Sequence, residues 1–236
     1  MVQTSLIILT RNEINGLKSL IRKIPFEEID EFFAIDYNSS DGTVEFFNKH
    51  QIEVINQKEP GRGKAFQLGF KRAKGKFLVF FSPDGNENPA DIPRLISKLK
   101  NGNDLVIASR FMKGSRNEED HKLIKFRAWA NRLFTLFVRI LWGGNVTDAI
   151  NGYRAIKKTS LSKLKLDATG FAIEYQMTIR ALKIGLKITE IPTIEGNRMG
   201  GKSTSYAIPT GLKFIYLLIR EITIQKGFIK KEYGNN

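Results

Sequence analysis

Residues 77–87 read FLVFFSPDGNE, a continuous apolar run that ends in a polar turn. Such an unbroken run, bounded by turn residues, is typical of a strand that is buried on both faces of a sheet. Pro83 restricts the backbone just after the run, and Asp84 and Gly85 have the chemistry of a turn. The stretch therefore predicts a central strand over 77–81 with polar groups at its carboxyl end.

The same alternation of apolar runs and helical patterns continues on both sides of this stretch. It predicts an α/β fold in which a mainly parallel sheet is flanked by helices. No repeat or Pro/Gly-rich linker divides the chain, so residues 1–236 are expected to form one domain with a more helical C-terminal part. We expect strands over 6–9, 32–35, 54–55, 77–81, 105–108 and 188–191, and helices over 14–23, 43–49, 64–73, 92–100, 122–142 (one helix or two), 173–182 and 209–225.

The bulk composition excludes several kinds of protein. With 42% hydrophobic and 26% charged residues, the 236-residue chain is expected to fold around one sizeable core. It has no cysteine and two histidines, which argues against a disulfide framework, a thiolate metal site and a histidine-rich zinc site. A net charge of +14 favours anionic partners, and charge alone leaves nucleic acid, anionic lipid and phosphorylated substrates open.

The sequence also bears on location. The N-terminus enters an apolar run at once, without the basic region and cleavage site of a signal peptide. The two most apolar segments, around 128–142 and 208–224, are interrupted by charges before they reach the ~20 apolar residues that cross a bilayer. We therefore expect a soluble or peripheral protein in the cytoplasm.

Polar groups follow four of the expected strands at the point where each ends. In parallel sheets, ligands bind beyond the carboxyl ends of the strands, so four such ends predict a shared ligand crevice. Asp36, at one strand tip, is placed to accept hydrogen bonds from a base or ribose. The four ends are Thr10–Glu13, Asp36–Asn38, Ser82–Asp84 and Ser109–Arg110.

Asp84 and Asn86 place a carboxylate and an amide oxygen two residues apart on one loop. Such ligands suit a hard divalent cation that keeps several waters and bridges a diphosphate, so Mg²⁺ or Mn²⁺ is the expected cofactor. The alternative is that Asp-Gly-Asn is turn chemistry alone.

Two basic segments that contain glycine could hold phosphates. Gly61–Lys64 precedes a helix and could bind phosphate at the helix N-terminus, although it lacks the spacing of a P-loop. Residues 196–204 have the composition of a loop that closes over a pyrophosphate, with Arg198 and Lys202 as its anchors. The alternatives are an ordinary basic turn and an exposed basic loop.

Asp148, in the segment 146–154, is a candidate for orienting or deprotonating an acceptor. The alternative is a structural ion pair with Arg154. Glu174, near the start of a helix, could serve catalysis or only complement the helix dipole.

Three ordered motifs link these segments: Thr-x-Asn-Glu at 10–13, Asp-x-x-Ser-x-Asp-Gly-Thr at 36–43 and Gly-x-Gly-x-Ala at 61–65. Together they resemble the family 2 glycosyltransferases, which have the Rossmann-like GT-A fold, and among them the dolichyl- or polyprenyl-phosphate sugar transferases. The resemblance runs from about residue 4 to about residue 222. It implies a nucleotide-sugar-binding half over 1–110, an acceptor-side half over 111–225 and a basic tail over 226–236.

Some positions depart from the family pattern. The metal motif is usually Asp-x-Asp, but Ser82 stands at its first position, and Asn86 falls where the subgroup often has glutamine. These two changes predict weaker metal binding. The other departures are Leu9 and Arg11 for the usual Pro and Tyr, Tyr37 for a second Asp, and Thr204 for the loop lysine.

The reaction that the resemblance implies is transfer of a sugar from a nucleoside diphosphate to an acceptor, with inversion at the anomeric carbon. Asp84 and Asn86 would hold the cation, and Asp84, Asp148 and Arg110 are the expected catalytic residues. A lipid-phosphate acceptor is already a nucleophilic anion, whereas a glycan hydroxyl would need Asp148 as its base. The residues expected to contact the nucleotide sugar are Leu9, Arg11, Glu13, Ile35, Asp36, Tyr37, Lys64, Pro83, Asp84, Arg110, Arg198 and Lys202.

Three other functions stay open. A sugar nucleotidyltransferase would want a glycine-rich basic loop after the first strand, where residues 10–13 are Thr-Arg-Asn-Glu. A nucleic-acid-binding protein should expose aromatic side chains for stacking, but the phenylalanines here fall mostly in strands, so no nucleic-acid partner is expected. Ser82 prompts the third, a transferase that binds a nucleotide sugar with little turnover.

Two basic amphipathic segments bear on the acceptor side. Segment 122–142 mixes arginine and lysine with leucine, phenylalanine and tryptophan, and could lie in the interface of an anionic membrane. Segment 209–231 allows the same interpretation. The alternative for both is a helix packed on the core with its basic residues in solvent. We expect peripheral association with the inner face of the cell membrane.

Overall fold

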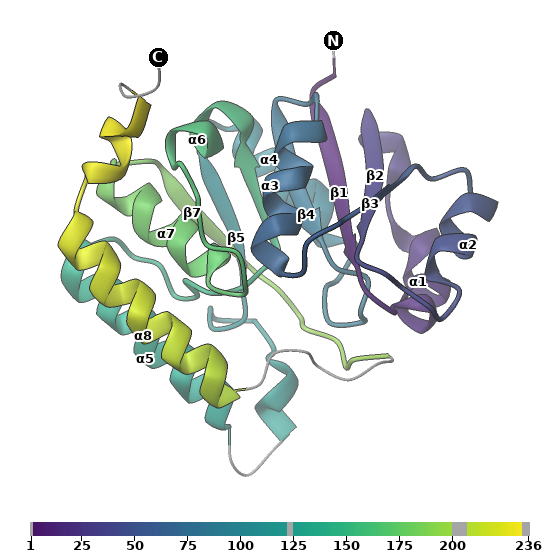
Figure 1. Ribbon diagram of the computed structural model, residues 1–236. Helices are drawn as coiled ribbons and strands as arrows, with labels where there is room; N and C mark the ends of the chain where they lie inside the picture. The colour runs from purple at the N-terminus through teal and green to yellow at the C-terminus, as the bar shows by residue number, and fades with distance from the viewer. Residues whose placement is uncertain (1, 122–124, 200–206, 233–236) are drawn as a thin grey trace.

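The computed structural model of the chain describes residues 2–121, 125–199 and 207–232 (Figure 1). Within these residues, seven strands form one sheet in the order β3-β2-β1-β4-β6-β5-β7. The pairings are parallel except those of β6, which runs antiparallel between β4 and β5. The predicted mainly parallel α/β sheet is therefore confirmed. The strands are β1 (Thr4–Thr10), β2 (Glu31–Asp36), β3 (Val54–Asn56), β4 (Phe77–Phe81), β5 (Leu105–Ser109), β6 (Arg154–Lys157) and β7 (Ile188–Pro192).

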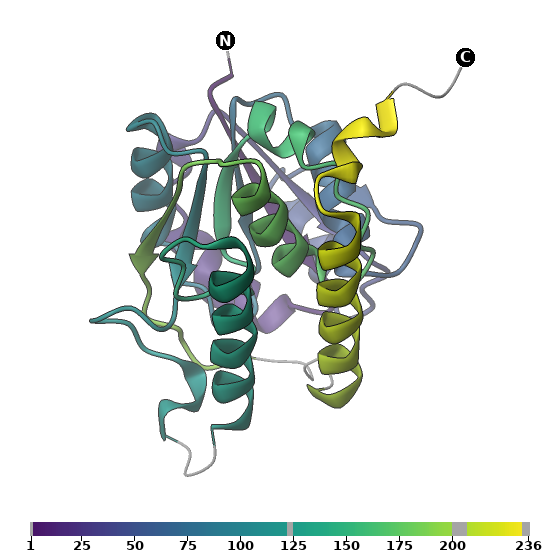
Figure 2. The ribbon, with the colours of Figure 1, turned by 90° about the vertical axis from the view of Figure 1, so that its left-hand side faces the viewer.

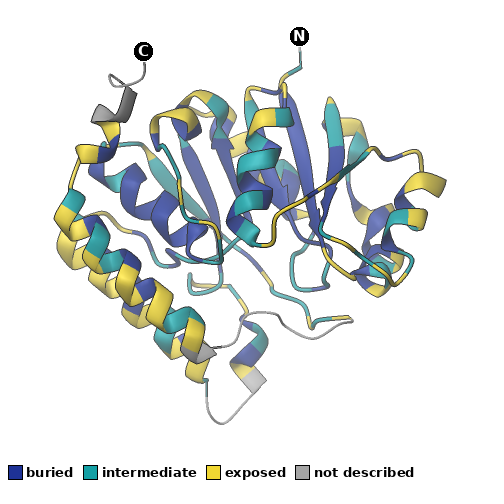
Figure 3. Ribbon diagram, viewed as in Figure 1, coloured by how far each residue is buried: buried dark blue, intermediate teal, exposed yellow. Residues whose placement is uncertain are grey.

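Helices cover both faces of this sheet. α1, α2 and α4 pack on one face, where Phe47 joins the core, and α3 and α7 pack on the other with Phe66 and Met177. Successive strand residues such as Ile7 and Ile8 point to opposite faces, so both must be apolar, which explains the unbroken apolar runs. The central strands are buried along most of their length (Figure 3). The helices are α1 (Ile14–Leu20), α2 (Thr43–Lys49), α3 (Arg62–Arg72), α4 (Asp91–Lys100), α5 (Phe126–Trp142), α6 (Lys158–Lys163), α7 (Ile173–Lys183) and α8 (Ala207–Ile224), with short 3₁₀ turns over 21–23, 26–28, 118–121 and 227–232.

Strand β6 and helix α6 were not predicted from the sequence. β6 begins with Arg154, whose side chain is fully buried and donates to the backbone oxygens of Asn151 and Glu174, both at 2.9 Å. An arginine thus fills a core position where the pattern requires an apolar residue. The strand predicted over 188–191 extends to Pro192, which the sheet tolerates because β7 is an edge strand.

α5 and α8 lie side by side, and both contact α7 (Figure 2). The rings of Phe134 and Phe214 pack edge to face, with their centroids 5.3 Å apart. The hydroxyl of Tyr175 in α7 donates to the backbone oxygen of Phe134 at 2.9 Å. The described part of segment 122–142 is thus a single helix. Among the described residues, no helix combines the length and the apolarity needed to cross a bilayer.

Candidate active site

The carboxyl ends of β1, β2, β4 and β5 lie at one edge of the sheet, as the four polar strand ends require. At the tip of β2, Asp36 is buried, and its carboxylate accepts from the hydroxyl of Thr10 at 3.1 Å and from the backbone nitrogen of Ser39 at 2.9 Å. The guanidinium of Arg11 lies 5.1 Å above the ring of Tyr37 on the rim. Behind this rim, Leu9 and Ile35 are buried in the core, so the backbone of these strand ends is what they can offer to a ligand.

Glu13 follows β1 and is buried at the same edge of the sheet. Its Oε1 accepts from Nη2 of Arg198 at 2.8 Å, whereas its buried Oε2 has no hydrogen-bond partner among the described residues. Burial raises the pKa of Glu13 to about 7, even though Arg198 acts to lower it. A ligand that donates a hydrogen bond would satisfy this oxygen.

The turn after β4 holds Asp84 and Asn86 in a fixed geometry. The backbone nitrogen of Asn86 donates to Oδ1 of Asp84 at 3.0 Å, and Gly85 between them has a φ of 102°. The Asn86 amide nitrogen donates to Oε2 of Glu118 at 3.2 Å, so its oxygen is turned the other way. That oxygen, Oδ1, is buried and has no partner among the described residues.

These atoms fit the expected divalent cation. A carboxylate and a partnerless amide oxygen on one turn are hard donors of the kind that Mg²⁺ and Mn²⁺ prefer. Within the parts of the chain that the structure describes, no cluster of three or more His, Cys, Asp or Glu side chains could hold a metal by itself. The protein would therefore supply two ligands, Asp84 and Asn86, and a bound diphosphate and water would have to complete the set.

Arg198 connects this turn to Glu13. Its Nη1 donates to Oδ2 of Asp84 and its Nη2 to Oε1 of Glu13, both at 2.8 Å. Two backbone bonds hold the segment on the turn, from Gly196 to the oxygen of Asn86 and from the nitrogen of Met199 to that of Asp84, both at 2.9 Å. The structure thus places Arg198 between Asp84 and Glu13, whereas Lys202 lies outside the described residues.

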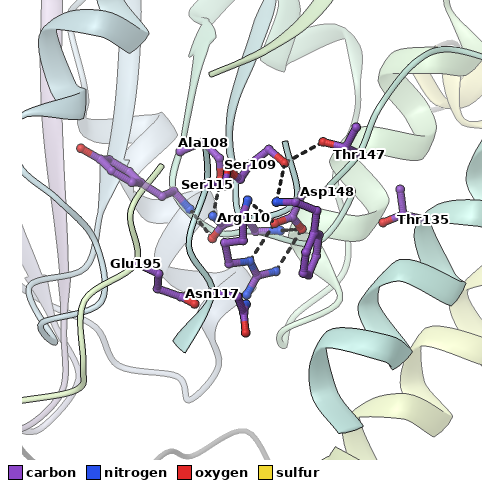
Figure 4. A network of polar contacts seen from close by, with 12 residues as sticks. Ala108, Ser109, Arg110, Ser115, Asn117, Thr135, Thr147, Asp148 and Glu195 are labelled. Carbon is purple, nitrogen blue, oxygen red and sulfur yellow. Dashed lines mark hydrogen bonds and ion pairs between the residues drawn. The ribbon is translucent and has the colours of Figure 1, made fainter. Parts of the chain in front are cut away.

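At the end of β5, Arg110 forms a two-pronged ion pair with Asp148 (Figure 4). The guanidinium donates to the two carboxylate oxygens at 2.7 and 3.0 Å, and the backbone nitrogen of Asn151 donates to one of them at 3.1 Å. Burial acts to raise the pKa of Asp148, but the adjacent Arg110 and these hydrogen bonds outweigh it and hold the pKa below its ordinary value. Asp148 is fully buried. Its ion-pair partner is Arg110 and not Arg154, because Arg154 donates to backbone oxygens instead.

A cavity of about 260 Å³ joins the β4 turn and Arg110 to the helix pair α5 and α8. Its strand-end wall is polar and its helix wall is partly aromatic. The strand-end wall includes Arg62, Ser82, Asp84, Asn86, Glu87, Arg110, Asn151, Gly152 and Glu195, and the helix wall includes Phe126, Arg127, Asn131, Phe134, Thr210, Gly211 and Phe214.

Lys64 lies elsewhere. It pairs with Glu59 at 2.8 Å and lines a separate cavity of about 570 Å³ between α3 and α6. The backbone nitrogen of Gly63 donates to the oxygen of Thr169 at 2.9 Å, so the start of α3 is covered by residues 168–169. The glycines of the Gly61–Lys64 turn serve this close packing, and the phosphate site predicted at the helix N-terminus is blocked there.

Two residues of the cavity were not singled out from the sequence. Arg62 pairs with Glu174 and donates from Nη1 to the hydroxyl of Ser82 at 3.0 Å. Glu87 accepts from the backbone nitrogen of Ser82 at 2.7 Å, and burial raises its pKa well above the ordinary value. The position of Arg62 between two glycines, directly before a helix, was the signal that could have indicated it.

Comparisons with known proteins agree with this fold. Residues 5–165 match the family model described as glycosyl transferase family 2. The chain is 30% identical over 233 residues to a dolichol-phosphate mannosyltransferase of Pyrococcus furiosus, covering 93% of this chain and 64% of that protein. It is also 30% identical over 213 residues to an undecaprenyl-phosphate mannosyltransferase of Micrococcus luteus, covering 84% of this chain and 85% of that protein.

A solved structure shows the same architecture. Glucosyl-3-phosphoglycerate synthase from Mycobacterium tuberculosis in complex with UDP matches with a TM-score of 0.74 at 21% identity, covering 94% of this chain and 80% of that one. Its complex with Mn²⁺, UDP and phosphoglyceric acid matches with a TM-score of 0.73 at 20% identity, covering 96% of this chain and 79% of that one. At this level of identity, the likeness shows a shared fold and confirms the expected GT-A architecture.

Proposed function

The chain belongs to glycosyl transferase family 2, and from that premise we propose that it transfers a sugar from a nucleoside diphosphate to a lipid phosphate. One observation carries the proposal: Asp84 and Asn86 line the cavity that also contains Arg110, and they place on one turn a carboxylate and an amide oxygen that has no partner among the described residues. A cation held there would offset the negative charge of a leaving nucleoside diphosphate.

The donor is bound at the ends of β1 and β2 in this proposal. Asp36 and the free Oε2 of Glu13 accept hydrogen bonds from the nucleoside, and Arg11 and Tyr37 form the rim. Pro83, whose backbone oxygen lies so close to α1 that a Cβ on Gly16 would be 1.8 Å from it, fixes the turn between nucleoside and diphosphate. The backbone at Leu9 and Ile35 completes the nucleoside site.

Arg110 and Arg198 stabilise the leaving diphosphate, and Lys202 adds a further positive charge. Arg110 can do so only if its fork is held in place, and the ion pair with Asp148 holds it. Arg198 exchanges its bonds to Glu13 and Asp84 for the diphosphate when the donor binds. The acceptor oxygen then forms a bond to the anomeric carbon as the bond from that carbon to the diphosphate oxygen breaks, with inversion.

The state of Asp148 favours a phosphate as the acceptor. A base for a glycan hydroxyl needs a reachable oxygen, but Asp148 is fully buried and Arg110 holds both of its oxygens. A lipid phosphate is ionised at neutral pH and needs no base. The similarity to a dolichol-phosphate mannosyltransferase and to an undecaprenyl-phosphate mannosyltransferase supports this choice.

The acceptor side faces an anionic membrane in this proposal, at the cytoplasmic surface. α5 and α8 expose apolar side chains such as Trp129, Ile140 and Ile219 along their outer faces. Basic residues accompany them on the same helices, among them Arg132 and Lys213. Exposed apolar side chains flanked by basic ones are the features of a helix that lies in a lipid interface.

The function is tested by donor binding and then by turnover. A thermal-shift series with GDP, UDP and their sugar conjugates, with and without Mn²⁺, should show stabilisation by at least one of them. Transfer from that donor to a short polyprenyl phosphate in detergent should release the nucleoside diphosphate. If no donor stabilises the chain, the proposal fails. If a donor binds but polyprenyl phosphate receives no sugar, the chain is a nucleotide-sugar binder or uses another acceptor.

A further inference from the structure

Arg62 projects into the active-site cavity from a backbone that has little freedom. A Cβ on Gly61 would lie 2.2 Å from the oxygen of Thr169, and one on Gly63 would lie 2.0 Å from the oxygen of Ala168. Both neighbours of Arg62 must therefore be glycine for the chain to pass this close. The close backbone packing at the start of α3 thus fixes the position from which the guanidinium extends.

The surroundings of the guanidinium are shaped to receive it. Nε pairs with the buried carboxylate of Glu174, Nη1 donates to the hydroxyl of Ser82 at 3.0 Å, and the guanidinium lies 5.5 Å from the centre of the Phe66 ring. A Cβ on Gly152 would lie 2.1 Å from Nη2, so this position leaves room for the arginine. The side chain is still one-fifth exposed (20%), and it lines the cavity next to Asp84.

The residue that Arg62 contacts, Ser82, changes the charge of the site. It stands at the first position of the motif, where a carboxylate would be expected to form an ion pair with Arg62. A serine hydroxyl accepts a hydrogen bond and adds no negative charge, so the cavity holds one carboxylate fewer beside Asp84. Glu174 already neutralises the charge of Arg62. The remaining N–H groups of Arg62 can donate to an anion.

We infer that Arg62 donates to the donor's diphosphate, and that the Ser82–Arg62 pair lowers the dependence of donor binding on the divalent cation. Arginine binds phosphate oxygens through charge-assisted hydrogen bonds and needs no metal to do so. The inference rests on the proposed function and adds to it a donor-binding residue and a reason for the serine.

The test measures the dissociation constants of GDP and UDP by calorimetry, once in EDTA and once in excess Mn²⁺. The wild-type chain should bind one of them in both conditions. Arg62→Met, which keeps the contact with Phe66, should weaken that binding roughly tenfold or more in EDTA and clearly less in Mn²⁺. Ser82→Asp should act in the same direction, because its carboxylate would occupy Arg62 and add a metal ligand.

Two further variants separate this role from folding. Arg72→Met removes an arginine of the same helix that is also paired, with Glu31 and Glu53, and it should leave both constants unchanged. Arg62→Met with Glu174→Gln removes the buried unpaired carboxylate and should bind as Arg62→Met does. Equal weakening with and without Mn²⁺, or none, overturns the inference. If the wild-type chain binds neither nucleotide in either condition, the proposed function itself fails.

Discussion

The donor side of the site and the outer face of α5 and α8 distribute charge in opposite ways. On the donor side, Asp84 and Arg110 line the cavity and Arg198 pairs with Asp84, and all three side chains are partly exposed. On the helix pair, apolar side chains face outward, while Glu221 of α8 is fully buried and pairs with Arg180 at 2.9 Å and Lys183 at 2.7 Å.

This difference indicates two kinds of ligand. A cavity lined by partly exposed charges suits a water-borne anion, because charges that water reaches can exchange partners at lower cost than fully buried ones. A helix that buries its ion pairs and exposes its apolar residues suits a surface that is not water. The cavity between them is where a soluble donor and a lipid acceptor would meet.

Among the variants that test this comparison, Asp84→Ala should have the largest effect. It removes a proposed metal ligand and one partner of Arg198, so we expect sugar transfer to polyprenyl phosphate to fall roughly 100-fold or more. Binding to vesicles should not change. Asp30→Ala is the matched control, because the hydrogen bonds of Asp30 to the described residues come from the backbone nitrogens of Gln3 and Thr4, at the far end of β1. Transfer at half the wild-type rate or better would contradict the proposed role.

Asp148→Asn tests whether the buried carboxylate positions Arg110 or removes a proton. The variant keeps the shape and loses the charge, so we expect transfer to fall roughly tenfold and the free energy of unfolding to fall by about 3 kcal/mol. The pH dependence of the remaining rate should keep its wild-type shape between about pH 6 and 9. Loss of an ionisation from that profile would identify Asp148 as the base.

Ile140→Glu combined with Ile219→Glu sharpens the other side of the comparison. Both side chains are more than half exposed, at 69% and 59%, so the fold should tolerate the change. Sedimentation with phosphatidylglycerol vesicles at low salt should weaken roughly tenfold, because each substitution removes apolar area from the contact. Ser97→Glu, exposed on α4, controls for added negative charge. Unchanged sedimentation, or none by the wild-type chain, would exclude this face as the membrane contact.

The last effect concerns the stability of the fold and not sugar transfer or membrane binding, and it depends on Glu13. Its pKa is about 7 in the folded chain against 4.5 ordinarily, so the folded state holds the proton more tightly, and stability is lost as the pH rises from about 4.5 to about 7. Glu13→Gln does not titrate. Its melting temperature should therefore gain about 5–10 °C relative to the wild-type chain between pH 5 and pH 8. Parallel melting curves at every pH would show that Glu13 has an ordinary pKa.

The fold could be predicted because its strands are buried on both faces. The run Phe77–Phe81 was predicted with its observed bounds, since an unbroken apolar run leaves few other structures. β6 was not predicted from the sequence, because Arg154 fills its core position in place of an apolar residue. Arg154 can do so because it donates hydrogen bonds to the backbone oxygens of Asn151 and Glu174. For Asp148 the sequence suggested an ion pair with a residue close in the chain, Arg154, but the partner is Arg110, which directly follows β5.

The grouping of several candidate site residues could be predicted for the same reason. Asp84, Asn86 and Arg110 follow strands directly, and strand ends meet by geometry. Arg62 could not be found this way, because the reason for its flanking glycines lies in the backbone of residues 168–169, far along the chain. The pairing of Arg198 with Glu13 also depends on distant segments, so the sequence could indicate only that a basic loop was available.

The reversed direction of β6 has a consequence for how the proposed donor site could diversify. Because β6 begins at the edge of the sheet where β4 and β5 end, residues before it, including Asn151 and Gly152, reach the cavity between those two ends. Two strand spacings, about 10 Å, therefore separate the turn proposed to hold the cation from Arg110. The hydrogen bonds between the strands of the sheet fix this distance. The loops on either side can therefore change in sequence and length to fit another sugar, while the distance between the turn and Arg110 stays constant.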